Sequence, residues 1–185
     1  MGDPSMKAMP SIEGVIDYAH FPLRSDRMDV FLCAGCRFFL GNTSGLSMIS
    51  TVFGVPCALV NMIPLTSMGW LSGDLCIPKL LRKRNDARYL SFAEILASEI
   101  GNYRMSSFYR DAGIEIDDNS PEDIFDLTVE MLDRLDGHGD KYRDYLKLQQ
   151  AFARLLKPQH YGYGTAARIG GLFLAKHPEL FPGKS

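Results

Sequence analysis

The stretch RFFLGNTSGLSMISTVFGVPCALVN, Arg37 to Asn61, decides which fold this chain is expected to adopt. It holds two short apolar runs, at 37–40 and 57–61, separated by a small-residue turn and by apolar residues at helical spacing. Continuous apolar runs of this length are typical of strands that are covered on both faces, as in a parallel sheet. The stretch therefore predicts a strand at 37–40, a helix at 44–53 that ends at Gly54, and a strand at 57–61.

The segment before this stretch extends the same alternation. The apolar run VIDYA at 15–19 predicts a strand, and Ser25 is a suitable N-cap for a helix over 26–35. Strand, helix, strand, helix, strand with short connections indicates right-handed βαβ units. We therefore expect an α/β fold in which a Rossmann-like parallel sheet is flanked by helices.

The rest of the chain is expected to complete the sheet and then become helical. Two helix starts carry local signals: Ser91 and Glu94 form a capping box, and Ser120 is followed by Pro121. We expect a single α/β domain over 1–185, with its core in 12–135 and a helical extension over 140–185. In chain order the later segments predict a long loop from 62, a strand near 75–81, a short helix from Ser91, a strand near 114–116, and helices over 120–137, 140–156 and 165–177.

The composition is that of a soluble globular domain, with 46% apolar residues, 23% charged residues and a net charge of −2. Domains that bind nucleic acid usually have a strong basic excess, so no nucleic-acid partner is expected. No apolar run approaches the about 20 residues that a membrane span needs, and the N-terminus lacks the features of a signal peptide. A cytoplasmic location without a transmembrane segment is expected.

The four cysteines give only a weak signal for metal or redox chemistry. Cys33 and Cys36 make a CxxC, but neither a second pair nor suitably spaced histidines follow it. The pair lies where an apolar helix is expected to lead into a strand, which favours buried thiols. No metal site is expected.

The turn GNTSG, Gly41 to Gly45, is a candidate phosphate cradle. After a parallel strand, the first N–H groups of the next helix point toward the crevice in which α/β folds bind ligands. Small residues let an anion approach these donors, and the hydroxyls of Thr43 and Ser44 add further ones. An unliganded tight turn that Thr43 or Ser44 caps accounts for the spacing equally well, so both interpretations stay open.

Three loops are expected to meet at this edge of the sheet, because parallel strands end on the same side. Arg24 would supply a cation for a diphosphate, or would form a surface salt bridge with Asp26 or Asp29. The three loops would bring together His20 and Arg24, then Asn42, Thr43, Ser44 and Gly45, and then Asn61, Thr66 and Ser67.

The motifs FLGNTSGLSMISTVFGVP, DLCIPKL, LSFAEIL, GIEIDDNSPEDI and YGTAARIG together resemble a family of predicted bacterial glycosyltransferases. The resemblance covers most of the chain. More distantly, the first third resembles the C-terminal lobe of heptosyltransferases and other GT-B enzymes, which binds the nucleotide-sugar donor. The usual Asp of their DSGL turn is Thr43 here, so no role of an acidic side chain is carried over to this position.

The resemblance implies a lobe that holds a diphosphate on the amides of Ser44 and Gly45 and on the hydroxyls of Thr43 and Ser44, with Arg24 offsetting its charge. Ribose or base would meet the loop 61–67. The nucleotide sugar is then a substrate, no cofactor or metal is required, and a glycan or another molecule is the acceptor. GT-B enzymes have two lobes and this chain has room for one. We therefore expect the isolated lobe to be inactive, with the N-terminal lobe supplied by a longer frame, another chain or self-association.

Two further functions stay open, and no catalytic residue is assigned. One is a sugar-nucleotide epimerase or hydrolase on the same scaffold, and the other is a non-catalytic interaction module. The late segment HYGYGTAAR predicts a helix cap with a packing role, or alternatively a brace between lobes that would make Arg168 a site residue. The acidic run EIDDNSPED predicts a loop and helix cap rather than a metal site.

Overall fold

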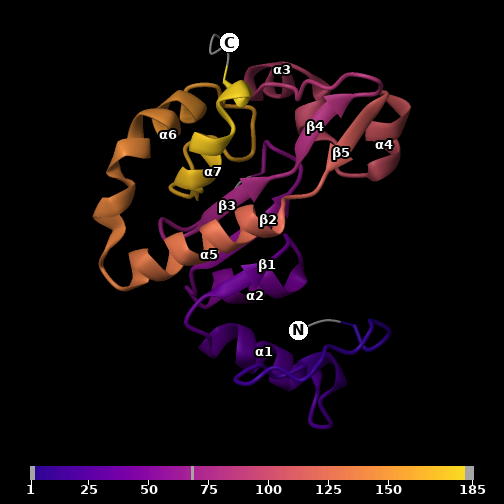
Figure 1. The fold of residues 1–185 in the computed structure, drawn as a ribbon, viewed down its shortest axis with the longest axis vertical. Helices are drawn as coiled ribbons and strands as arrows, with labels where there is room; N and C mark the ends of the chain where they lie inside the picture. Colours follow the sequence, from indigo (N-terminus) through magenta and orange to yellow (C-terminus); the bar gives the residue numbers. More distant parts are fainter. Residues whose placement is uncertain (1–2, 68, 182–185) are drawn as a thin grey trace.

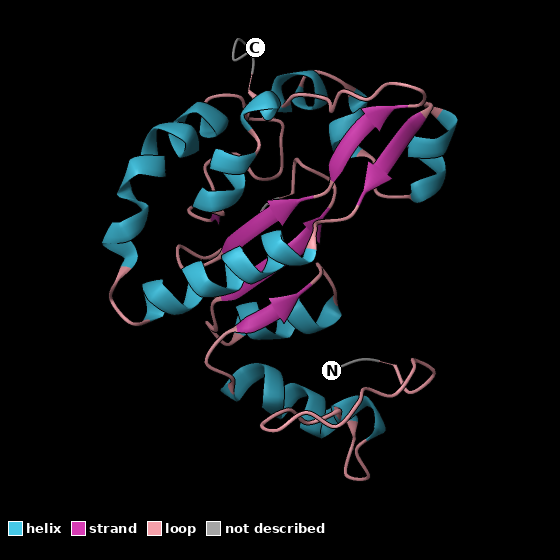
Figure 2. Ribbon diagram, in the orientation of Figure 1, coloured by secondary structure: helices cyan, strands magenta, loops and turns pink. Residues whose placement is uncertain are grey.

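The computed structural model describes residues 3–67 and 69–181 and shows a mixed α/β arrangement (Figure 1). A four-stranded parallel sheet has the order β1-β2-β3-β6. Its strands are β1 (Phe39–Gly41), β2 (Cys57–Met62), β3 (Leu75–Pro78) and β6 (Arg168–Ile169). A separate antiparallel pair is formed by β4 (Leu80–Lys83) and β5 (Ile114–Asp117), and both sheets are visible in Figure 2.

Helices flank the parallel sheet. Helix α2 follows β1 and packs on β1 and β2, while α5 packs along β2 and β3. Helix α1 packs on α2, and α7 packs on α5 and α6. The helices are α1 (Asp26–Gly35), α2 (Gly45–Val52), α3 (Phe92–Leu96), α4 (Ser106–Asp111), α5 (Pro121–Leu135), α6 (Leu146–Ala153) and α7 (Gly171–Lys176), with 3₁₀ turns at Tyr18–His20, Glu99–Asn102, Gly139–Tyr145 and Pro178–Leu180.

Local signals correctly predict the best-defined elements. Ser25 caps α1 by accepting the Met28 N–H, and Ser91 and Ser120 form capping boxes at α3 and α5. Gly54 follows α2 with φ +74°, a conformation that favours glycine. The parallel order of β1, α2 and β2 confirms the expected βαβ unit.

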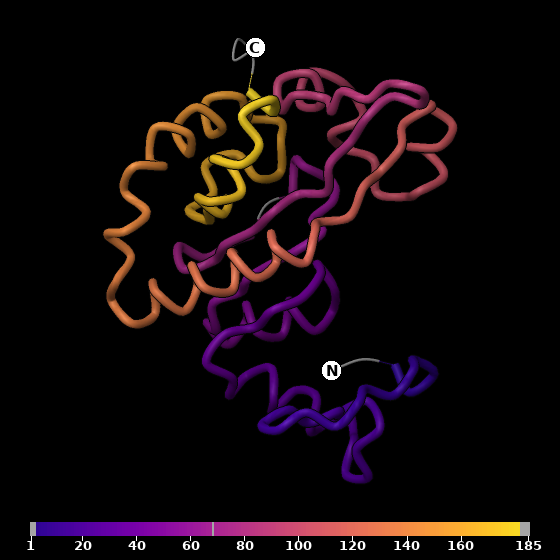
Figure 3. The backbone as a smooth tube through the Cα atoms, viewed as in Figure 1, coloured from indigo at the N-terminus to yellow at the C-terminus, as the bar shows by residue number. Residues whose placement is uncertain are grey.

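The predicted strand at 15–19 is wrong. Val15 and Ile16 are 49% and 71% exposed, and Tyr18–His20 form a 3₁₀ turn instead. The carboxylate of Asp17 accepts the Met9 N–H at 3.0 Å and lies 2.8 Å from His20 Nδ1. Polar bonds of this kind compete with pairing in a sheet. Figure 3 shows this N-terminal segment running beside α1, outside the sheet.

Three later expectations also need correction. The strand expected near 75–81 divides into β3 and β4, which belong to different sheets. The helix expected over 140–156 is a 3₁₀ turn followed by α6, and the helix expected from 165 begins only at Gly171. The preceding strand β6 has two residues, too few to leave a periodic pattern, and the side chain of Gln149 bonds both backbone groups of Ile169.

One cluster of buried apolar side chains joins the two sheets and the C-terminal helices. It includes Leu59 and Ile77 of the parallel sheet, Leu81 of the antiparallel pair, Phe152 of α6 and Phe173 of α7. Within the described chain, no helix combines the length and the apolar character needed to cross a membrane.

Candidate functional site

A pocket of about 510 Å³ lies where β1 and β2 end, at the carboxyl edge of the parallel sheet. Its lining contains both apolar and polar side chains. The lining comes from α2 and its preceding turn, from the loop after β2, and from two distant loops. The lining residues are Thr43, Ser44, Ser47, Met48, Thr51, Leu59, Ile63, Pro64, Ser67, Trp70, Arg104 and Tyr161.

The start of α2 is partly closed by its own side chains. Ser44 and Ser47 form a capping box, in which Ser47 Oγ accepts the Ser44 N–H at 3.1 Å. The N–H groups of Gly45 and Leu46 have no acceptor among the described residues. Gly45 is exposed and Leu46 is half-buried; neither lines this pocket, and Leu46 lines a neighbouring groove. The turn is therefore a capped connection that also leaves two donors without an acceptor in the described chain.

Arg104 supplies the positive charge of this pocket. It follows the 3₁₀ turn at Glu99–Asn102, is exposed, and forms no salt bridge with any described residue. None of the lining residues is an aspartate or glutamate. Sequence reasoning missed Arg104 because the loop 103–105 carries no motif and lies some 60 residues beyond the turn in the chain, at a place that only folding makes adjacent.

Arg24 and His20 are not in this pocket, because the segment expected to be a strand lies outside the sheet. Arg24 is exposed, and its N–H bonds the Phe21 carbonyl at 3.0 Å. His20 contacts Asp17 through Nδ1 and the Pro4 carbonyl through Nε2. The hydrogen bond with Asp17 raises the pKa of His20. The role expected of Arg24 is thus not supported by its position.

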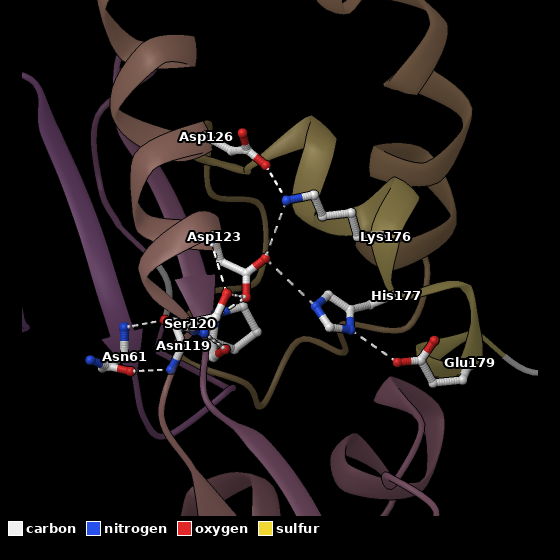
Figure 4. Close-up of polar contacts among 9 residues, drawn as sticks. Asn61, Asn119, Ser120, Asp123, Asp126, Lys176, His177 and Glu179 are labelled. Carbon is white, nitrogen blue, oxygen red and sulfur yellow. Dashed lines mark hydrogen bonds and ion pairs between the residues drawn. The ribbon is translucent and has the colours of Figure 1, made fainter.

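Two other expected site residues have structural partners. Asn61 is joined to Asn119 by two hydrogen bonds, which Figure 4 shows. Thr66 is buried, and its hydroxyl donates to the Gly101 carbonyl at 2.9 Å. Ser67, by contrast, lines the pocket.

The remaining expected residues lie in neighbouring hollows. Asn42 lines a second, more apolar groove of about 580 Å³ between α1, the N-terminal segment and β1, and Ser44 borders both hollows. Arg168 lines a third pocket, of about 430 Å³, together with Tyr163. The segment HYGYGTAAR therefore places Tyr161 in the first pocket and Arg168 in a different one.

Trp70 and Tyr161 form the aromatic wall of the first pocket. Their ring centroids are 4.8 Å apart and the rings are nearly perpendicular, at 86°. The wall is anchored by Asp74, whose buried carboxylate accepts the N–H groups of Trp70 and Leu71, each at 2.8 Å, and of Cys57 at 2.9 Å. The sequence gives no signal for this wall, because Trp70 and Tyr161 come from loops that are far apart in the chain and carry no periodic pattern.

The acidic run at the start of α5 has a structural role (Figure 4). Asp123 caps the helix together with Ser120 and lies 3.9 Å from both Lys176 Nζ and His177 Nε2. Asp126 pairs with Lys176, and Glu179 with His177. Among the described residues, no group of three or more histidines, cysteines or carboxylates is arranged to hold a metal.

The cysteines are thiols that no disulfide joins in the described part of the chain. Cys33, Cys57 and Cys76 are buried and Cys36 is half-buried. Burial raises the pKa of Cys57 to about 11 and that of Cys76 to about 12. These two therefore stay protonated at neutral pH and are poor nucleophiles.

No protein-family model, no curated protein and no solved structure matches this chain. The family resemblance therefore stays a prediction. The geometry shows an α/β protein with a four-stranded parallel sheet and a cationic, carboxylate-free pocket at the sheet edge.

Proposed function

We propose that this chain is the nucleotide-sugar-binding lobe of a glycosyltransferase, with the donor's diphosphate held at the start of α2. The observation that carries the proposal is the position of Arg104 in the same pocket as Thr43 and Ser44, with no acidic side chain in the lining. An anion placed there meets attraction and no charge repulsion from the pocket wall.

The chemistry of the pocket fits a diphosphate. The hydroxyls of Thr43 and Ser44 line the pocket and can donate to an anion. The amides of Gly45 and Leu46, next to Ser44 in the chain, lie at the positive end of a helix dipole. A guanidinium can bond two phosphate oxygens at once. These groups would stabilise a nucleoside diphosphate as it leaves, without a metal or another cofactor.

The proposal reassigns the expected binding residues. Arg104 takes the role expected of Arg24. Asn61 and Thr66 are no longer proposed as ligand-binding residues, because their polar groups form hydrogen bonds within the fold. Ser67 stays, since it lines the pocket. No residue of this chain is proposed as catalytic, and the acceptor is expected to bind a second lobe.

Calorimetric titration with UDP, GDP, ADP, CMP and inorganic pyrophosphate tests the proposal, in buffer that contains EDTA. We expect a diphosphate to bind and Arg104→Gln to weaken it about tenfold or more, since a charge-assisted hydrogen bond contributes about 1.5–3 kcal/mol. Arg110→Gln is the matched control, because Arg110 is an exposed arginine of α4 that lines none of the pockets described above. A folded protein that binds neither pyrophosphate nor any nucleotide would refute the proposal.

A second candidate is a non-catalytic interaction module, which one observation favours. Of the 21 large apolar side chains that are exposed among the described residues, 13 lie between Met6 and Phe53. Exposed apolar surface that gathers in one region is typical of protein–protein contacts. Light scattering with and without UDP separates the two functions: an obligate dimer that ignores nucleotides supports the module.

A further inference from the structure

The aromatic wall formed by Trp70 and Tyr161 is called the aromatic corner below, because the two rings are nearly perpendicular. This corner lines the same pocket as Thr43 and Ser44, which precede α2. Trp70 is 47% exposed and Tyr161 is 61% exposed, so both side chains are accessible to a ligand. The two side chains come from the loop 63–74 and the loop 157–167, which are far apart in the sequence. An exposed aromatic pair inside a pocket offers flat apolar surface to a ligand.

Hydrogen bonds of the two loops fix the backbone that carries the aromatic corner. The Trp70 and Leu71 N–H groups donate to Asp74, and the Thr165 hydroxyl donates to the Gly69 carbonyl at 2.6 Å. The Gly162 N–H donates to the Thr66 carbonyl, also at 2.6 Å. These bonds join the two loops close to the rings, since Gly69 directly precedes Trp70 and Gly162 directly follows Tyr161. The rings are therefore presented on fixed backbone, which lowers the entropic cost of binding.

We propose that Trp70 and Tyr161 bind the nucleobase of the donor whose diphosphate lies at α2; this inference rests on the proposed function. One pocket of about 510 Å³ is lined by the aromatic corner and by Arg104, Thr43 and Ser44. This volume lies within the about 300–1,000 Å³ of small-molecule sites. A ligand that spans both ends needs a planar ring and a negatively charged group, as a nucleoside diphosphate has.

The angle between the rings fixes how a base lies. Because the rings stand at 86°, a base stacked on the Trp70 indole lies nearly perpendicular to the Tyr161 ring. Stacked and edge-to-face contacts are both favourable aromatic geometries. Neither contact reads the hydrogen-bonding edge of a base, since every base has a π-face. The site therefore selects for a base but discriminates little between uracil, guanine and adenine.

Trp70 is the single tryptophan of the chain, which makes the test direct. Titration of the unmodified protein with UDP is expected to quench its fluorescence, because the base stacks on the only indole. Inorganic pyrophosphate is expected to bind without this quenching. GDP and ADP should quench as UDP does, with dissociation constants within about tenfold of one another.

Variants separate the base site from the anion site. Trp70→Leu and Tyr161→Leu are each expected to weaken UDP binding roughly five- to 150-fold, the range found for removing a stacked aromatic, and to leave pyrophosphate binding unchanged. Tyr163→Leu is the matched control, because Tyr163 is 55% exposed but lines another pocket. Thermal unfolding of each variant checks that the fold is kept.

The outcomes distinguish the two proposals. If UDP and pyrophosphate bind with equal affinity, fluorescence does not change, and both leucine variants bind UDP as the unmodified protein does, the aromatic corner is not a base site, although the anion site stands. If UDP quenches Trp70 while pyrophosphate fails to bind and Arg104→Gln has no effect, the base site stands and the anion site at α2 is wrong. If neither ligand binds, both proposals are refuted.

Discussion

Asn61 and Asn119 bond each other's backbone: the Asn61 N–H donates to Asn119 Oδ1 at 2.6 Å, and the Asn119 N–H donates to Asn61 Oδ1 at 2.7 Å. Asn61 has φ +52°, in the left-handed region that asparagine tolerates better than most residues. Asn119 Nδ2 also donates to the Pro78 carbonyl at 2.7 Å. This pair joins the ends of β2 and β3 to the start of α5 (Figure 4).

Asn119→Ala is expected to destabilise the protein by about 2–4 kcal/mol, because the Asn61 N–H and the Pro78 carbonyl lose their partners in a mostly buried place. Urea unfolding measures the change. Asn102→Ala, at an exposed asparagine, should cost little. An Asn119→Ala variant with an unchanged free energy of unfolding would show that the hydrogen bonds of Asn119 contribute nothing to stability.

Asp74→Ala is expected to loosen the aromatic wall. The buried carboxylate satisfies three N–H groups, and each hydrogen bond to a charged group is worth about 1.5–3 kcal/mol, although the effects do not add fully. We expect a lower midpoint of thermal unfolding and a red-shifted emission of Trp70. Ser72→Ala, an exposed position in the same loop, is the control. If Asp74→Ala is destabilised but the Trp70 emission is unchanged, the carboxylate stabilises the fold without positioning Trp70.

Glu130 is a buried carboxylate that ties α5 to α7. Its Oε1 accepts two bonds from Arg134, and its Oε2 accepts the Gly171 N–H at 2.7 Å. Glu130→Ala is expected to cost about 3–5 kcal/mol, because it removes one partner of a buried ion pair and a helix cap. The midpoint of urea denaturation checks this loss, and Glu122→Ala, at an exposed position of α5, should be far milder.

Burial raises the pKa of Glu130, so its effect on stability depends on pH in a definite direction. In the window above its ordinary pKa, the native state holds the proton more tightly than the unfolded state does. The contribution is therefore fully present below the unfolded pKa and is lost as the pH rises through the folded pKa. The free energy of unfolding of the unmodified protein minus that of Glu130→Gln should fall as the pH increases from 4. A difference that does not change with pH would contradict this direction.

Glu94 shows the opposite dependence. Its hydrogen bonds with Arg88, then those with Ser91, lower its pKa to about 2. Its contribution is present above the unfolded pKa and is lost as the pH falls toward 2. Since its side chain is 43% exposed, we expect Glu94→Gln to cost only about 1 kcal/mol at neutral pH and less than half of that near pH 2. Urea unfolding at both pH values checks this, and equal costs at both would contradict it.

The sequence by itself determined the elements whose signals are local. Ser25, Ser91 and Ser120 cap helices through residues at most three positions away, and the apolar run at 57–61 is a strand because both of its faces are covered. The unit from β1 through α2 to β2 and the turn at Thr43 and Ser44 follow from the same short-range patterns. Capping, glycine conformation and apolar periodicity act over a few residues, so the chain order alone records them.

Only the tertiary structure decided which side chains share the pocket. Arg104, Trp70 and Tyr161 line the same pocket as Thr43, although they are far from it in the sequence. The Asn61 N–H donates a hydrogen bond to Asn119, a residue 58 positions away. The apolar run at 15–19 stays outside the sheet because the bonds of Asp17 compete with strand pairing. Irregular loops carry no periodicity, and their place is set by long-range hydrogen bonds and packing that appear only when the chain folds.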